Sequence, residues 1–148
     1  MEIKQTVSFS LSNISVSYRN LLEKLMDEIG LHGGQVYVLN ELWEHDGQSQ
    51  AEIMKRLAVS APTITKMISS LVSASFIQTK KCKNDARLTR VYLTKKGKVI
   101  QPLVMTQWAK LEEIALKDFS DAEKVLVSLL LEKLKINFSS GYFTKFGL

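Results

Sequence analysis

KKCKNDARLTRVYLTKKG, residues 80–97, decides the fold of this 148-residue chain. The stretch is crowded with lysine and arginine and contains a single acid. Its second half alternates apolar and polar residues, which puts Val91 and Leu93 on one face of a strand and the polar residues on the other. The residues in its middle resemble a turn. We therefore predict a basic β-hairpin with strands at residues 76–82 and 88–93.

Two short helices are predicted just before the hairpin, at residues 49–57 and 61–73. Ser49 and Glu52 have the spacing of a capping box, in which each side chain bonds the backbone of the other residue. Pro62 suits the first turn of the second helix because its missing N–H is not needed there. Two helices across so brief a link form a helix-turn-helix pattern.

The second of these helices carries no acidic residue, which is unusual for a helix at a protein surface. A carboxylate there would repel phosphate and would pair poorly with most base edges. We therefore predict that its outward residues bind DNA. These residues are Pro62, Thr63, Thr65, Lys66, Ser69 and Ser70.

The positive charge of the chain is concentrated in one segment. Lys55 to Lys98 contains eleven basic residues and one acid, a net charge of +10, whereas the rest of the chain carries −5. A protein that needs only solubility intersperses its charges, so this concentration favours a polyanionic partner such as nucleic acid. Charge alone leaves a second interpretation open, a solvated basic face with no partner.

Longer amphipathic helices are predicted on both sides of this segment, from apolar residues spaced three and four apart. They cover residues 6–29, 35–45, 94–117 and 120–138. The whole is a mainly α protein with a small antiparallel β-wing, that is, a winged helix-turn-helix lobe at about 31–98. Residues 1–30 and 99–148 form a helical region that we expect to dimerise.

In a winged helix, one helix enters the major groove while the hairpin reaches the backbone or an adjacent minor groove. We expect Lys80, Lys81 and Lys83 to face phosphates, and Arg87 to enter a narrow minor groove. Asp85 either orients an arginine, Arg87 or Arg90, through an ion pair or forms an Asx-type turn. The two interpretations of Asp85 can hold together. Asp85 and Arg90 are included among the DNA-binding candidates of the wing.

The chain here resembles the MarR family of bacterial winged-helix transcription regulators. The wing residues that fit the signature of the family are Asp85, Arg87, Leu93, Thr94 and Gly97. LHGGQVYVLNEL and SAPTITKMISSLVSASFI resemble its second helix and its recognition helix. The chain departs from the usual family residues at Ser69, Ser70, Ser75 and Ala86. The resemblance therefore implies the fold but no particular operator sequence.

The resemblance implies a homodimer on a pseudo-palindromic operator, most commonly acting as a repressor. The leucines at 126, 129, 130, 131 and 134 cover more than one helical stripe, which favours a dimer over a monomer core. Many members bind small aromatic or phenolic ligands. Tyr18, Arg19, Tyr37 and Trp108 are our candidates for such a site, with Arg19 as the partner of a carboxylate. Aromatic residues at helical spacing also commonly belong to a core.

Other classes of function have less support. The two histidines stand in no recognisable triad, and no phosphate loop or metal motif occurs, so we expect no enzyme, cofactor or metal. Cys82 is either a small apolar filler or a redox sensor. No apolar run spans a membrane, no signal peptide is visible and the cysteine is single, so we expect a cytoplasmic protein. Two alternatives stay open: a winged helix that binds another protein, and a regulator of the same family type without a small-molecule ligand.

Overall fold

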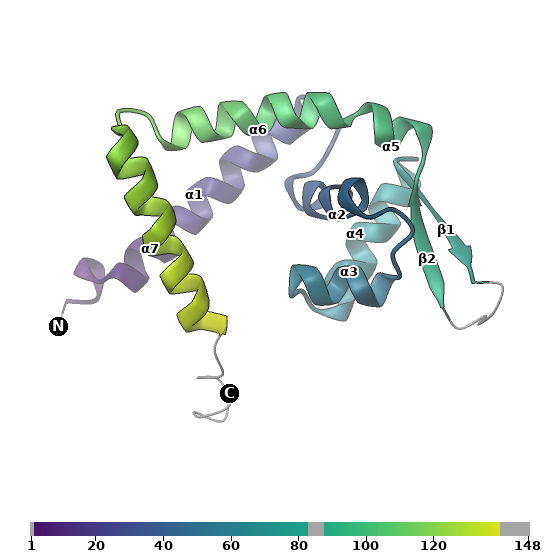
Figure 1. Cartoon of the computed structure of the whole chain (residues 1–148), viewed down its shortest axis with the longest axis horizontal. Coiled ribbons are helices and arrows are strands. Elements are labelled where there is room, and N and C mark those ends of the chain that lie inside the picture. Colours follow the sequence, from purple (N-terminus) through teal and green to yellow (C-terminus); the bar gives the residue numbers. More distant parts are fainter. Residues whose placement is uncertain (1, 83–87, 140–148) are drawn as a thin grey trace. The chain divides into compact units, whose positions relative to one another are not determined.

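A computed structural model of the protein describes residues 2–82 and 88–139. The chain divides into two compact units, Met1–Leu111 and Glu112–Leu148. Helices dominate both units (Figure 1). In chain order the elements are η1 (Ile3–Gln5), α1 (Val7–Asp27), α2 (Gly33–Glu44), α3 (Gln50–Leu57), α4 (Ala61–Ser73), β1 (Ile77–Lys81), β2 (Thr89–Leu93), α5 (Lys95–Val99), α6 (Gln101–Ala115) and α7 (Asp121–Ser139). The prediction of a mainly α fold with a small antiparallel wing is confirmed.

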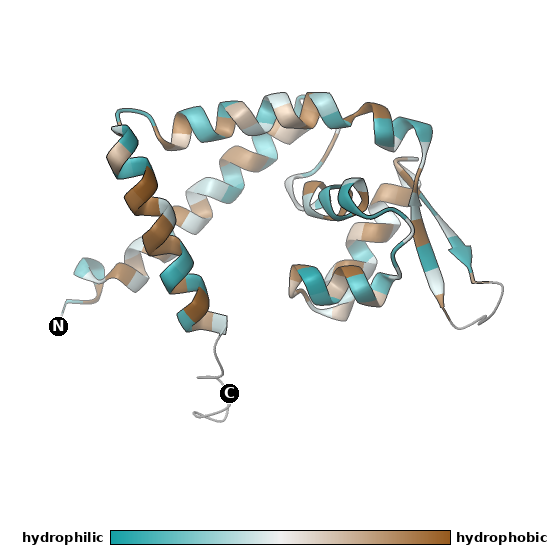
Figure 2. Ribbon diagram, in the orientation of Figure 1, coloured by the Kyte–Doolittle hydropathy of each residue, from teal (hydrophilic) through white to brown (hydrophobic). Residues whose placement is uncertain are grey.

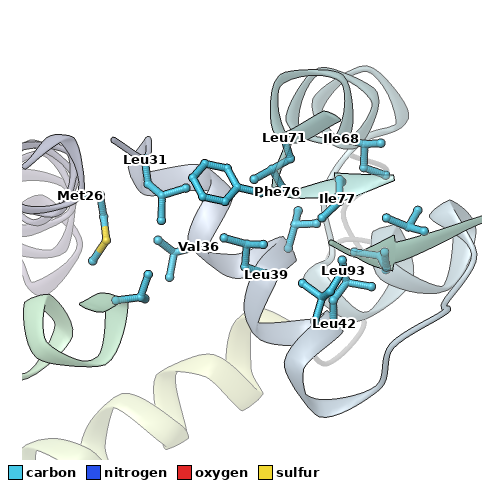
Figure 3. Close-up of a cluster of buried hydrophobic side chains, with 14 of the residues drawn as sticks. Met26, Leu31, Val36, Leu39, Leu42, Ile68, Leu71, Phe76, Ile77 and Leu93 are labelled. Carbon is cyan, nitrogen blue, oxygen red and sulfur yellow. The ribbon is translucent and has the colours of Figure 1, made fainter. Parts of the chain in front are cut away.

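The core of the first unit lies around α2, whose Val38, Leu39 and Leu42 are fully buried. Figure 3 shows side chains from other elements gathered against this helix, among them Met26 of α1 and Phe76 before β1. Core positions on α2 recur every three or four residues, as expected of an amphipathic helix that packs on several neighbours. This cluster fixes α4 and the hairpin to one scaffold.

The hairpin has the predicted alternation of faces. β1 pairs antiparallel with β2, and Ile77 lies opposite Leu93 while Thr79 lies opposite Val91. Val91 and Leu93 are buried, whereas the other residues of β2 are half-buried. One face of β2 therefore joins the core and the other turns outward.

The second helix begins at Gly33, earlier than the predicted start at residue 35. Gly33 and Gly34 form the first turn of α2. The Glu23 carboxylate accepts a hydrogen bond from the Gly33 amide at 2.7 Å, and the Gln35 side chain accepts one from the His32 amide at 2.9 Å. These bonds satisfy amides that the first helical turn leaves open, which offsets the poor helix propensity of glycine.

The single helix predicted over residues 94–117 is wrong, because the structure has two helices there, α5 and α6. The break falls at Ile100, two residues before Pro102. Proline has no N–H, so the carbonyl oxygen of Lys98 receives no bond from the next turn. Thr94 begins α5 as predicted, and its hydroxyl oxygen accepts a hydrogen bond from the Gly97 amide at 3.1 Å.

In the part of the chain that the structure describes, the second unit consists of the end of α6 (residues 112–115), the link at residues 116–120, and α7. No residue of α7 is buried. Figure 2 shows hydrophobic residues recurring along this helix. The exposed apolar side chains of α7 are Val125, Leu126, Leu129, Leu130, Leu131, Ile136 and Phe138. None of the described helices is long and apolar enough to cross a membrane.

Candidate nucleic-acid interface

The helix-turn-helix is built by two capped helices. The Ser49 hydroxyl accepts a hydrogen bond from the Glu52 amide at 3.2 Å, and the Glu52 carboxylate accepts one from the Ser49 amide at 2.7 Å, so the predicted capping box is present. Ala58 ends α3 in the left-handed region at φ 51°. Ser60 then caps α4, its hydroxyl accepting a bond from the Thr63 amide at 3.4 Å. These local bonds set the tight turn between the two helices.

The two sides of α4 differ as predicted. Ile64, Ile68 and Leu71 are buried in the core. The exposed residues among the DNA-binding candidates are Pro62, Thr63, Thr65, Lys66 and Ser69. The whole helix, residues 61–73, lacks an acid, so no carboxylate of α4 opposes a phosphate.

Several polar side chains of α4 are held by neighbouring helices. Gln50 of α3 donates to the Thr65 hydroxyl at 2.9 Å, and Gln35 of α2 donates to the Ser70 hydroxyl at 2.7 Å. Ser70 is therefore half-buried and bonded to α2, unlike the exposed Ser69. This distinction could not be read from the sequence, where the two serines look alike.

The wing is attached to the loop between α2 and α3. The Val91 amide donates to the Gln48 carbonyl oxygen at 2.8 Å, and the Gly47 amide donates to the Val91 carbonyl oxygen at 3.1 Å. Arg90 Nη1 donates to the Gly47 carbonyl oxygen at 2.8 Å. Asp46 accepts a further bond from the Leu93 amide at 2.9 Å. The orientation of the hairpin is thus fixed by hydrogen bonds to the loop that precedes the helix-turn-helix.

The basic side chains of β1 are exposed. Lys80 lies with its ammonium group 5.5 Å from the centre of the Tyr92 ring, a cation–π distance. Lys81 ends the strand and is also exposed. Three further candidates, Lys83, Asp85 and Arg87, lie outside the described residues.

Glu52 is an acid that borders this surface, and its charge is balanced by its surroundings. Bonds from the Ser49 amide and hydroxyl lower the pKa of the Glu52 carboxyl, and the charges of Arg90 and Arg56 lower it further. Arg90 Nη1 lies 4.0 Å from this carboxylate. Arg90 therefore links the wing to α3 as well as to the α2–α3 loop.

A second feature of the first unit is a cavity of about 360 Å³ between α2 and α6, which we name the α2–α6 cleft. Its aromatic lining is Tyr37, Trp43 and Trp108. Its aliphatic lining is Val36, Leu57, Val104 and Met105, and its polar lining is Asn40 and Glu41. Tyr37 and Trp108 meet edge to face, with ring centres 6.3 Å apart.

Three of the four ligand-site candidates come together at this cleft. Tyr37 and Trp108 line it, and the Tyr18 hydroxyl lies 3.2 Å from the Tyr37 hydroxyl. Arg19 is exposed and is not part of the lining, and its Nε donates to the Ser15 carbonyl oxygen of its own helix at 3.2 Å. Sequence reasoning missed Glu41, although it follows Tyr37 by four residues and so shares its helix face.

Comparisons with known proteins agree with this architecture. The family model described as MarR family matches residues 32–89. The HTH-type transcriptional regulator YwoH of Bacillus subtilis is 31% identical over 123 residues, which cover 81% of this chain and 89% of YwoH. The MarR protein of Peptoclostridium difficile is 27% identical, with a TM-score of 0.85 over 97% of this chain and 96% of that one.

Two more distant structures share the fold. A MarR family transcriptional regulator from Listeria monocytogenes, determined in complex with 26mer DNA, has a TM-score of 0.81 at 24% identity and covers 97% of this chain and 96% of its own. Bordetella bronchiseptica BpsR, whose DNA binding is regulated by 6-hydroxynicotinic acid, has a TM-score of 0.83 at 18% identity over 91% of this chain and 96% of BpsR.

The chain belongs to the MarR family. It is a DNA-binding transcriptional regulator with a winged helix-turn-helix, as the wing and the two capped helices predicted.

Proposed function

We propose that the protein acts as a homodimeric, sequence-specific repressor that a small aromatic ligand releases from DNA. The observation that carries the DNA-binding part is the exposed, acid-free side of α4 next to a basic hairpin anchored to the same lobe. In this proposal α4 enters the major groove, and Thr63, Thr65 and Lys66 read base edges together with Pro62 and Ser69. Ser70 is bonded to Gln35 of α2, so its role in this proposal is to orient α4.

The wing contributes affinity with little sequence preference in this proposal. Lys80, Lys81 and Lys83 neutralise phosphates, and Arg87 enters the minor groove. Asp85 fixes the shape of the wing. Arg90 acts from within the lobe, because its guanidinium group bonds the Gly47 carbonyl oxygen.

The exposed apolar side chains of α7 support the dimer. Leu129 is 58% exposed and Leu130 is 49% exposed, and these side chains have no core to join within residues 112–139 of their unit. A surface of this kind is typical of a subunit interface. A two-fold dimer places two recognition helices about 34 Å apart, one turn of DNA.

Two charge-introducing variants and one matched control test the dimer. Leu129→Lys and Leu130→Lys put a charge on the apolar side chains of α7 and should convert the dimer to a monomer in sedimentation experiments, with loss of DNA binding. Lys133→Leu, on the same helix, should leave the dimer intact. A wild-type protein that sediments as a monomer at the concentrations where it binds DNA would contradict this part of the proposal.

The α2–α6 cleft supports the ligand part. Its volume is within the range of small-molecule sites, and it combines aromatic walls with few polar groups. A ligand controls the protein only if it binds the DNA-free arrangement better than the DNA-bound one. A tenfold loss of DNA affinity requires about 1.4 kcal/mol of such preference. Regulation of DNA binding by an aromatic acid in BpsR, which shares the fold, supports this kind of control.

The competing function is binding of another protein through the winged-helix surface. Fluorescence anisotropy with a labelled AT-rich duplex at two salt concentrations separates the two. The proposal predicts binding that weakens steeply with salt, because lysines displace counterions from phosphates. Absence of binding to any duplex at low salt would favour the protein-binding alternative.

A further inference from the structure

We infer that the ligand of the α2–α6 cleft is a small aromatic cation, such as an aryl amine or aryl ammonium compound. This inference rests on the proposed function, which puts the controlling ligand in this cleft. It goes further by specifying the charge of that ligand. It follows from three properties of the lining: the aromatic walls, a carboxylate without a hydrogen-bond donor, and the absence of a basic residue.

The aromatic walls favour positive charge. Tyr37, Trp43 and Trp108 all line the cleft, and the faces of such rings carry negative potential that attracts cations. The polar atoms of two of them are already engaged. The Trp43 indole N–H donates to the Gly97 carbonyl oxygen at 2.9 Å, and the Tyr37 hydroxyl pairs with the Tyr18 hydroxyl. These rings therefore offer a ligand mainly carbon surface.

The acidic side chain in the lining is Glu41. Its Oε2 is buried and has no hydrogen-bond donor among the described residues. Arg56 Nη1 lies 3.6 Å from this oxygen, close enough for an ion pair but too long for a hydrogen bond. This oxygen has almost no accessible surface, so a ligand in the cleft does not bond it directly. The negative charge of Glu41 instead attracts a cation through space, and this attraction needs no N–H on the ligand.

None of the residues that line the cleft in the described structure is basic. Arg56 is not part of the lining, and neither is Arg19. The other polar residue of the wall, Asn40, donates to the Glu44 carboxylate at 3.3 Å. An aromatic acid would bring its carboxylate against Glu41 with no guanidinium or ammonium partner. A cation is attracted both by the Glu41 carboxylate and by the faces of the aromatic rings.

The volume of the cleft limits the ligand to a small ring system. About 360 Å³ is near the lower end of the range for small-molecule sites. Phenyltrimethylammonium and its uncharged isostere tert-butylbenzene are suitable probes, because they share size and shape and differ in charge. Salicylate serves as the anionic probe.

The two tryptophans of the chain are Trp43 and Trp108, and both line the cleft, so tryptophan fluorescence reports binding there directly. In titrations of the full-length protein without DNA, phenyltrimethylammonium should bind at least about tenfold more tightly than either tert-butylbenzene or salicylate. Glu41→Gln should remove most of this preference and leave binding of the uncharged probe unchanged. Arg56→Gln should instead strengthen binding of the cation, because it removes the competing positive charge.

Asp27→Asn is the matched control, an exposed acid at the end of α1 outside the lining, and it should change nothing. Equal or tighter binding of the isostere or of salicylate would overturn the inferred charge and leave ligand control in place. Failure of the cation to bind at millimolar concentration would also overturn it. Binding of the cation with the expected dependence on Glu41, but without release of DNA in a parallel anisotropy assay, supports the inferred charge and refutes ligand control.

Discussion

The guanidinium group of Arg90, on the second strand of the wing, donates a hydrogen bond of 2.8 Å to the carbonyl oxygen of Gly47, in the loop that precedes the helix-turn-helix. The same side chain lies 4.0 Å from the Glu52 carboxylate of α3. Arg90 thus holds the wing against α3 and the loop that precedes it. Its contribution to DNA binding in our account is made through these two interactions.

Arg90→Ala should therefore lower the free energy of unfolding by about 1 kcal/mol, the usual net value of a hydrogen bond from a charged donor that is partly exposed. DNA affinity should fall because the wing loses its anchor, while the slope of log affinity against log salt stays unchanged. Denaturant unfolding and binding at several salt concentrations measure both. Unchanged stability together with a flatter salt slope would show that Arg90 contacts phosphate instead.

Gly97→Ala should destabilise the lobe by about 3 kcal/mol, at the upper end of what overpacking costs. A Cβ at this position would lie 2.1 Å from the Phe76 carbonyl oxygen, and backbone cannot yield as a side chain can. Gly34→Ala is the matched control, because its added Cβ would meet only the flexible end of Met67 at 3.3 Å. Denaturant unfolding should show a large loss for the first variant and little change for the second.

Glu23→Gln tests how α2 is capped. The Gly33 amide, and next the His32 ring, lower the pKa of the Glu23 carboxyl from its ordinary value of 4.5. A lowered carboxyl pKa stabilises the fold above the ordinary value, and this contribution is lost as pH falls through the lowered value. The stability difference between the wild type and Glu23→Gln should therefore shrink between about pH 5.5 and pH 3.

Asp27→Asn is the control for this experiment. Asp27 is an exposed acid at the end of α1, the helix that also carries Glu23, and its carboxylate makes no hydrogen bond within the described residues. Unfolding curves at each pH should give a difference for Asp27→Asn that changes little with pH. A Glu23→Gln difference that grew toward low pH would contradict the capping role.

Lys81→Ala tests the electrostatic contribution of the wing. The slope of log affinity against log salt should flatten by about one for each phosphate that the variant no longer neutralises, and by twice that if the substitution acts in both subunits of a dimer. Lys124→Ala on α7, whose ammonium group lies 3.3 Å from the Asp121 carboxylate, should leave the slope unchanged. Equal slopes for Lys81→Ala and the wild type would show that Lys81 does not neutralise a phosphate.

The elements set by local rules could be predicted from the sequence. The capping box of Ser49 and Glu52 and the two faces of the wing strand depend on spacings within a few residues, and both are present. The break at Ile100 was missed although Pro102 was visible, because apolar periodicity continues across it. Apolar periodicity indicates which face of a helix is buried, but it does not show that Pro102 lacks the amide N–H that the helix needs.

The interactions of the site were less predictable because they join residues far apart in the chain. Arg90 and Gly47 are separated by 43 residues, and nothing local indicates that they bond. The aromatic candidates of the cleft came from the family resemblance, and the sequence could not exclude Arg19 from it. Its position one residue after Tyr18 turns it to a different side of the helix, and there it bonds its own backbone.

Selection of bound duplexes from a random pool tests the central claim most directly, that the exposed side of α4 reads DNA sequence. The wild type should select a roughly palindromic consensus with half-sites about one helical turn apart. A variant that combines Thr63→Ala with Lys66→Ala, both exposed on α4, should select a different or degenerate consensus. An unchanged consensus in that variant would contradict the assignment of α4 as the reading helix.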